Sequence, residues 1–297
     1  MRWLCPALLA GAVLHASCAV AAGPETIDLA YDVSVAGVPA LGLRLEVDVR
    51  PDRYQIASVM ETRGFIGLLF PWTMQSEVRG VVVGDVLRPV DYRFSSVLYG
   101  TERTARLRFA PDGSVTTETN HVSGDEDRAP VPPEMRRGSV DVLTGILRVT
   151  RRLDRTGLCT TTVPVFDGRR RYDLLFSDAP LDAANPRHVR TCVGSINRIA
   201  GFLKSAFAWG DDDDGRAASI SAARIFPGAP LIPFRLEFGT PVGVAYAQLQ
   251  EARHRGKVLA GAAIRPLDEG MAVPPKTGAP TMSGTPREDP LMLPRGD

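Results

Sequence analysis

The sequence predicts a mainly β fold in which antiparallel strands form a meander within one curved β-domain. Two observations favour this class. Apolar and polar residues alternate along several segments, which is typical of strands with one buried and one solvated face. The segments are joined by short turns rich in Pro, Asp and Gly, too short for the crossover that parallel strands require.

The expected strands follow one another from residue 43 onward. At residues 43–49, Leu and Val alternate with Arg, Glu and Asp before a Pro-Asp turn. Further strands are expected at residues 54–60, 74–83, 87–97 and 104–110. Helical periodicity is weak. One short helix is expected at residues 139–152, where Val140, Leu143 and Leu147 fall on one side.

Residues 164–176, PVFDGRRRYDLLF, predict a β-hairpin. Asp167-Gly168 forms the turn, because Asp can bond the local backbone and Gly tolerates positive φ. Three arginines, Arg169, Arg170 and Arg171, then lead into a strand that starts at Tyr172. Neighbouring side chains of a strand point to opposite faces, so Arg170 is expected to face away from the other two.

Two interpretations of these arginines stay open. In one, the hairpin is solvated and one arginine pairs with a carboxylate, that of Asp173 or Glu61. In the other, Arg169 and Arg171 clamp a carboxylate or phosphate headgroup, with the hydroxyl and ring of Tyr172 beside it.

Cys159 and Cys192 flank the hairpin and predict a disulfide. An exported chain meets oxidising conditions, and the sequence contains no CxxC motif or histidine at ligand spacing from either cysteine.

The first residues predict export. A single charge, Arg2, precedes an apolar stretch and the small-residue zone Ala16–Ala22, which is the pattern of a signal peptide over residues 1–22. Two alternatives are an uncleaved anchor, for which the apolar core is short, and a lipoprotein modified at Cys18. His15 stands where a lipobox usually carries an aliphatic residue. No transmembrane span is expected in the mature chain.

Charge argues against nucleic acid as a partner. Lys and Arg number 35 against 34 Asp and Glu, so no broad basic field is expected.

The remainder divides into a single β-rich domain over residues 23–265 and a Pro-rich tail over residues 266–297, expected to be disordered. One apolar segment, residues 64–72, interrupts the strands and contains Phe65, Phe70 and Trp72. It is either a loop that plugs one end of the sheet, or the mouth of an apolar ligand site or a membrane-touching lip.

Several segments together resemble one family, the bacterial exported proteins called domain of unknown function 3108 (DUF3108). The matching segments are Tyr31-Asp32-Val33 with Gly37, residues 64–71, Asp141-Val142-Leu143-Thr144, residues 164–174, Cys192, and Ile199-Ala200-Gly201-Phe202. Val142 departs from the usual Pro. The resemblance covers residues 31–249 and implies a periplasmic, mostly antiparallel β-domain that is an open or half-closed barrel. It implies no activity.

Signals for catalysis are poor, and no catalytic residue, metal or cofactor is expected. The sequence lacks GxSxG, HExxH and Walker motifs. The acidic run at residues 211–214 lacks the Glu of a calcium loop, since Ala222 stands in its place. His121, His188 and His254 are predicted to be surface histidines.

Three functions stay open. We favour a non-catalytic binding module for a hydrophobic or amphipathic envelope ligand, a lipid or glycoconjugate, using Arg169, Arg171, Tyr172, Phe65, Phe70 and Trp72. The first alternative is a structural or assembly factor that binds envelope proteins. The second is a carboxylate-dependent hydrolase or lyase acting on envelope polymers, whose acid pair would leave no sequence motif.

Overall fold

The computed structural model describes residues 26–120, 128–179, 189–202, 218–240 and 243–267. The predicted signal peptide and Cys18, the acidic run at residues 211–214, His121, His188 and nearly all of the predicted tail lie outside the described residues.

The described strands form one 14-stranded antiparallel sheet in the order β7-β6-β5-β4-β3-β2-β1-β13-β12-β11-β10-β9-β8, with β14 paired to β13. The strands of the first half are β1 (Ile27–Val35), β2 (Val38–Val49), β3 (Arg53–Thr62), β4 (Trp72–Val83), β5 (Val86–Leu98), β6 (Thr101–Phe109) and β7 (Val115–Thr119). Those of the second half are β8 (Thr161–Phe166), β9 (Arg171–Asp178), β10 (Arg190–Ala200), β11 (Ala218–Ala223), β12 (Ile232–Thr240), β13 (Gly243–His254) and β14 (Lys257–Ala260).

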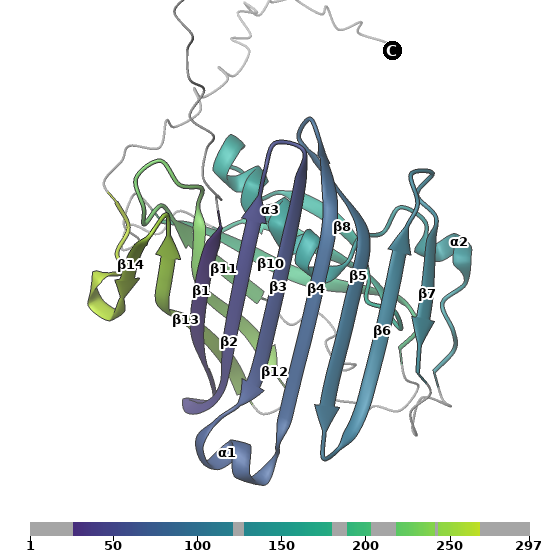
Figure 1. Ribbon diagram of the computed structural model, residues 1–297, viewed down its shortest axis with the longest axis horizontal. Helices are drawn as coiled ribbons and strands as arrows, with labels where there is room; N and C mark the ends of the chain where they lie inside the picture. Colours follow the sequence, from purple (N-terminus) through teal and green to yellow (C-terminus); the bar gives the residue numbers. More distant parts are fainter. Residues whose placement is uncertain (1–25, 121–127, 180–188, 203–217, 241–242, 268–297) are drawn as a thin grey trace, which may run out of the picture.

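Within the described residues, three α-helices accompany the sheet: α1 (Gly64–Leu69), α2 (Pro133–Arg136) and α3 (Val142–Thr156); a short 3₁₀ helix covers Gly261–Ala263. The sheet curls so that its second half lies behind its first half, with α3 between them (Figure 1). Contacts place α3 against β8 on one side and β5 on the other. The mainly β, antiparallel meander is therefore confirmed, with three helices where one was expected.

The curled sheet does not close, because β7 and β8 end the strand order without pairing to each other. The β8–β9 loop reaches across this seam. The guanidinium of Arg169 donates to the carbonyl of Thr104 at 3.2 Å and to that of Asn120 at 3.0 Å. Val140 forms a parallel bridge with Val165, which ties the chain before α3 to β8. The structure is a half-closed barrel held by side chains along its seam.

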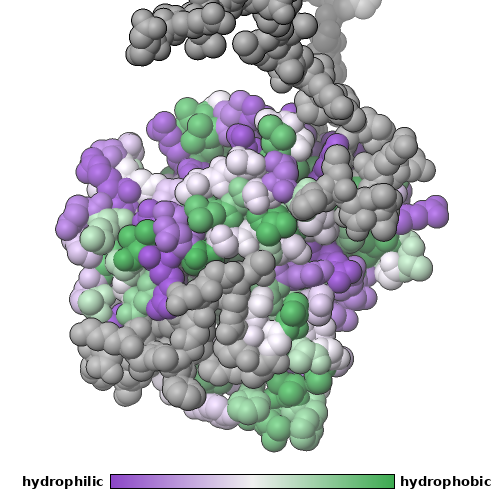
Figure 2. Space-filling view, turned by 180° about the vertical axis from the view of Figure 1, so that it is seen from behind, coloured by the Kyte–Doolittle hydropathy of each residue, from purple (hydrophilic) through white to green (hydrophobic). Residues whose placement is uncertain are grey.

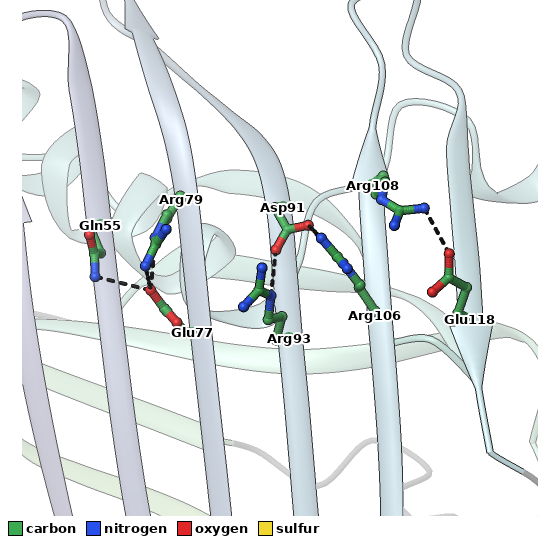
Figure 3. Close-up of polar contacts among 8 residues, drawn as sticks. All are labelled: Gln55, Glu77, Arg79, Asp91, Arg93, Arg106, Arg108 and Glu118. Atoms are coloured by element: carbon green, nitrogen blue, oxygen red, sulfur yellow. Dashed lines mark hydrogen bonds and ion pairs between the residues drawn. The ribbon is translucent and has the colours of Figure 1, made fainter.

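The two faces of the first half differ as the alternation predicts. Inward residues such as Ile56, Val78 and Leu107 are buried. The outward face carries a row of hydrogen bonds and ion pairs that crosses β3 to β7 (Figure 3). In this row Glu77 accepts from Gln55 and Arg79, Asp91 accepts from Arg93 and Arg106, and Glu118 accepts from Arg108. The expected strands at residues 43–110 are all present and mostly longer than predicted.

The main helix starts later than predicted. Ser139 and Val140 lie outside α3, since Val140 is held in the bridge to Val165. Asp141 is the N-cap, and its carboxylate accepts the backbone N–H of Thr144 at 2.9 Å. The helix ends at Gly157, whose positive φ of 69° terminates it.

The expected alternation of the arginines is wrong. Only Arg171 belongs to strand β9, whereas Arg169 and Arg170 lie in the turn. Asp167 forms that turn as predicted: its carboxylate accepts the backbone N–H groups of Arg169 and Arg170. Gly168 adopts the positive φ that was expected, at 100°.

Candidate functional site

A cavity of about 1180 Å³ lies inside the curled sheet, beside α3. Its volume exceeds the roughly 300–1,000 Å³ of pockets for drug-sized ligands. The sheet contributes inward residues of β1 to β5, among them Leu29, Leu43, Leu45, Ile56, Met60, Met74 and Phe94. The cavity is thus large enough for an extended or multi-chain apolar ligand.

The opposite wall comes from α3 and from the segment before β12. Helix α3 contributes Val142, Leu143, Ile146 and Leu147, which recur at helical spacing, and the second segment contributes residues around Leu231. Behind α3, the packing is close. A Cβ at Gly145 would lie 3.4 to 3.6 Å from Val165, Val163 and Leu174. The face of α3 that contains Gly145 therefore packs against β8 and β9, and the larger side chains of the helix border the cavity.

The polar groups inside the cavity bond mainly to one another. The hydroxyls of Ser58 and Ser76 lie 2.6 Å apart on neighbouring strands. Ser96 accepts the indole N–H of Trp72 at 2.9 Å, and the hydroxyl of Tyr31 donates to the carbonyl of Pro233 at 2.6 Å. Because these groups are paired, an apolar ligand would not leave them unsatisfied.

The charged residues of the lining are mostly arginines. Among the described residues, the lining contains Arg103, Arg128, Arg151, Arg155, Arg169, Arg170, Arg224 and Arg255, with only Asp154 and Asp167 as acids. Asp154 pairs with Arg224 at 3.0 Å and Asp167 with Arg170 at 2.9 Å. The lining is therefore rich in arginine, the side chain that most readily pairs with carboxylate and phosphate groups. Several of these arginines also have partners within the protein, among them Arg155 with Asp85 and Arg169 with two backbone carbonyls.

A fully buried carboxylate, that of Asp141, lies at the start of α3. Its second oxygen accepts the hydroxyl of Thr144 at 2.6 Å, and that hydroxyl lies 2.8 Å from the hydroxyl of Tyr54 on β3. Burial raises the pKa of Asp141 to about 6, against the lowering effect of its hydrogen bonds to Thr144. Burial also raises the pKa of Tyr54 and Tyr172. This network fastens α3 to the first half of the sheet.

The disulfide is present as predicted. Cys159 and Cys192 are bonded, with their Cα atoms 5.4 Å apart, and both are buried. The bond ties the segment after α3 to strand β10, and it is compatible with an exported protein.

The described residues contain neither a cluster of metal-ligating side chains nor a helix that could span a membrane. No group of His, Cys, Asp and Glu there is arranged to hold a metal ion. No helix within the described ranges has the length and apolar content needed to cross a membrane.

The profile of a family described as "Protein of unknown function (DUF3108)" matches residues 30–178, from β1 to the end of β9. The chain belongs to the DUF3108 family. The match includes the segments that carry the resemblance as far as the hairpin at residues 164–176, and it ends before β10.

Two solved structures that the chain resembles are distant from it in sequence. A beta-barrel-like protein of domain of unknown function DUF1849 from Brucella abortus has a TM-score of 0.46 and 11% identity, covering 78% of this chain and 99% of its own. The hypothetical protein CT021 from Chlamydia trachomatis has a TM-score of 0.26 and 8% identity, covering 80% of this chain and 91% of its own. No curated protein matches the chain.

In this DUF3108 protein only one of the two arginines predicted to clamp a headgroup borders the cavity. Arg169 and Tyr172 border the cavity, but Arg171 does not. The guanidinium of Arg171 pairs with Asp173 at 2.7 Å, so the Arg–carboxylate interpretation holds for this residue. Glu61, the other proposed partner, pairs with Arg63. Arg170, expected to face away, borders the cavity because the turn rotates it inward.

The three aromatic residues of the apolar segment also differ in whether they border the cavity. Trp72 borders the cavity, whereas Phe65 and Phe70 do not. Their side chains are solvent-exposed, Phe65 to 71% and Phe70 to 52%, on and after the short helix α1. The plug interpretation is therefore wrong for residues 64–71, none of which is buried, and only Trp72 at the end of the segment reaches the sheet interior.

The prediction that His254 is a surface histidine is wrong. It is only 6% exposed, its ring lies 5.6 Å from that of Phe226, and it borders the cavity. The sequence places it between arginines at the end of β13, which predicted a solvated position. Its burial comes from the segment before β12, whose packing against β13 leaves no local signal in the sequence.

Proposed function

We propose that this protein is a non-catalytic binding module that holds a hydrophobic or amphipathic ligand inside the curled sheet. The observation that carries the proposal is the apolar cavity of about 1180 Å³ between β1–β5 and α3. An acyl chain or a comparable apolar group would occupy it, because burial of apolar surface favours binding at roughly 25 cal/mol per Å².

The arginines in the lining support an anionic headgroup on the same ligand. An amphipathic molecule with a carboxylate or phosphate would leave its charged end near the guanidinium groups and its apolar part between Leu43 and Leu147. Envelope lipids and glycoconjugates have this chemistry. The proposal includes export to the periplasm, which the disulfide between Cys159 and Cys192 supports.

The test compares two neighbours on β3. Met60 borders the cavity, and Val59 is exposed on the other face of the same strand. Met60→Trp should fill part of the cavity and weaken binding of a fluorescent fatty acid roughly tenfold, whereas Val59→Trp should not. Native mass spectrometry of protein purified from a periplasm should in addition show a bound lipid or glycolipid that organic extraction removes.

Two results would overturn the proposal. One is a wild-type protein that neither binds the fatty acid nor carries a removable mass. The other is equal affinity in Met60→Trp and Val59→Trp, which would place any binding outside the cavity. Either result would favour the assembly-factor hypothesis, in which envelope proteins are the partners.

A further inference from the structure

Exposed apolar side chains gather around α1, at the end of the sheet where β3 turns into β4. They are Phe65, Leu68, Leu69, Phe70 and, from the β5–β6 turn, Tyr99; we call this cluster the apolar lip. Leu68 is 82% exposed and Phe65 is 71% exposed. In Figure 2 a group of hydrophobic side chains lies at the bottom of the molecule, where Figure 1 places α1. Helices of soluble monomers seldom expose such a cluster without a partner.

The lip differs in charge from the rest of this half of the sheet. Residues 64–72 contain no charged side chain. The outward face of β3 to β7 instead carries the row of ion pairs in Figure 3. If the lip inserted into an apolar medium, no charged side chain within residues 64–72 would have to lose its hydration.

Polar backbone groups at the end of α1 already have partners inside the protein. The hydroxyl of Tyr99 donates to the carbonyl of Leu69 at 2.6 Å. The hydroxyl of Thr62 donates to the carbonyl of Phe70 at 2.8 Å and accepts the backbone N–H of Trp72 at 3.0 Å. Carbonyls at the end of a helix normally bond to water, and in an apolar medium they need such internal partners.

Two apolar residues lie next to the lip and also border the cavity. Trp72 comes two residues after Phe70 and pairs with Leu98, which directly precedes Tyr99, across β4 and β5. Both residues border the cavity, and Leu98 is also 44% exposed. A ligand that passed along the side chains of Trp72 and Leu98 at this end of the sheet would stay in contact with apolar groups of both the lip and the cavity lining.

We propose that the apolar lip inserts into the surface of a lipid bilayer and that the amphipathic ligand exchanges between bilayer and cavity beside Trp72 and Leu98. A bilayer fits better than a protein because it accepts projecting apolar side chains without shape complementarity. A specific protein interface would need about 800 Å² per partner, far more than one short helix and one tyrosine supply. Aromatic residues such as Tyr99 and Trp72 are also those that settle at a membrane interface. The exchange step rests on the proposed binding function, whereas the insertion does not.

Vesicle binding of the full-length protein tests the insertion. The probe is a vesicle of phosphatidylethanolamine and phosphatidylglycerol, and binding is measured by cosedimentation. Phe65→Ser with Leu68→Ser should reduce the partition coefficient about tenfold or more. The matched control is Val81→Ser with Val83→Ser, which removes two exposed apolar side chains at the opposite end of β4 and should leave partition unchanged.

A second measurement does not depend on loss of binding. Leu68→Trp places a fluorophore on the lip, and Val83→Trp places one at the opposite end. Vesicles with brominated acyl chains should quench the emission added by Leu68→Trp and leave that added by Val83→Trp unchanged. Three results would overturn the insertion. The wild-type protein could fail to bind vesicles, the serine variant could bind as well as the wild type, or quenching could be equal at positions 68 and 83.

Binding of a soluble fluorescent fatty acid without vesicles separates the two proposals. If the lip variant binds this probe normally but no longer binds vesicles, both proposals stand. If the wild type does not bind the probe but binds vesicles through the lip, the binding function fails and the insertion stands. If the probe binds and the vesicle binding does not depend on the lip, only the insertion fails.

Discussion

Asp141 gives a stability prediction whose sign follows from its burial. The carboxyl is fully buried at the start of α3, and its pKa rises from 3.8 to about 6. The folded protein therefore holds a proton on Asp141 between about pH 4 and pH 6 that the unfolded chain releases. The unfolding free energy contributed by this group falls as the pH rises through that window, and it stays at the lower level above it.

The magnitude follows from the shift of about 2 units in pKa. At 1.36 kcal/mol per unit, the contribution of Asp141 to the unfolding free energy changes by about 3 kcal/mol between pH 4 and pH 7. The substitution Asp141→Asn keeps an oxygen that can accept the backbone N–H of Thr144, and it carries no charge at any pH. The variant should therefore lack this part of the pH dependence.

Urea denaturation of both proteins at several pH values measures the effect. Other carboxylates titrate equally in the two proteins, so their contributions cancel in the difference. Relative to the wild type, Asp141→Asn should gain about 3 kcal/mol of unfolding free energy between pH 4 and pH 7. As a control, the exposed Asp112 has a pKa lowered by its hydrogen bonds to Ser114, so its contribution changes only below about pH 4, and Asp112→Asn should show little change relative to the wild type between pH 4 and pH 7. An Asp141→Asn difference that is independent of pH would refute the reasoning.

Two further predictions concern the frame of the barrel. Replacement of Cys159 and Cys192 by Ala should lower the unfolding free energy by about 3–4 kcal/mol, because the disulfide closes a loop with a sequence separation of 33 residues. Urea denaturation with and without reductant measures this loss. A loss below about 1 kcal/mol would contradict the prediction. Gly201→Ala should cost more stability than Gly37→Ala, because both residues have positive φ but only at Gly201 would the added Cβ meet a backbone carbonyl, 2.0 Å from that of Arg169. The expected difference is about 1–3 kcal/mol in thermal or chemical unfolding, and equal costs would show that the Arg169 loop yields freely.

Much of the sheet could be predicted from the sequence because strand alternation is a local signal. The alternation over residues 43–49 is enough to distinguish the apolar face of β2 from its polar face. The turn at Asp167-Gly168 follows from the chemistry of two residues. The start of α3 was harder to predict. Val140 fits the helical pattern of Leu143 and Leu147, but a bridge to Val165, far along the chain, holds it extended.

The cavity could not be predicted from the same pattern. Leu43 and Leu45 alternate with polar residues much as Val78 and Leu107 do, yet the first two border the cavity and the last two are packed core. Which inward residues meet a partner depends on how far the sheet curls and where α3 lies. The same limit explains Arg170, which the turn directs inward although a strand would have pointed it outward.

The meander does, however, determine that the lip and two residues of the cavity lining, Trp72 and Leu98, share one end of the sheet. In an antiparallel meander the connections alternate between the two ends of the sheet. The β3–β4 connection, which contains α1, and the β5–β6 turn, which contains Tyr99, are separated by two strands and so fall at the same end. The β4–β5 turn between them falls at the opposite end, beside Val83. The hydrogen bond from Tyr99 to Leu69 is a consequence of this parity, as is the place of Leu98 at both the lip and the cavity. The apolar segment between β3 and β4 is therefore positioned by topology next to Trp72 and Leu98 of the cavity lining, where we propose that the ligand exchanges.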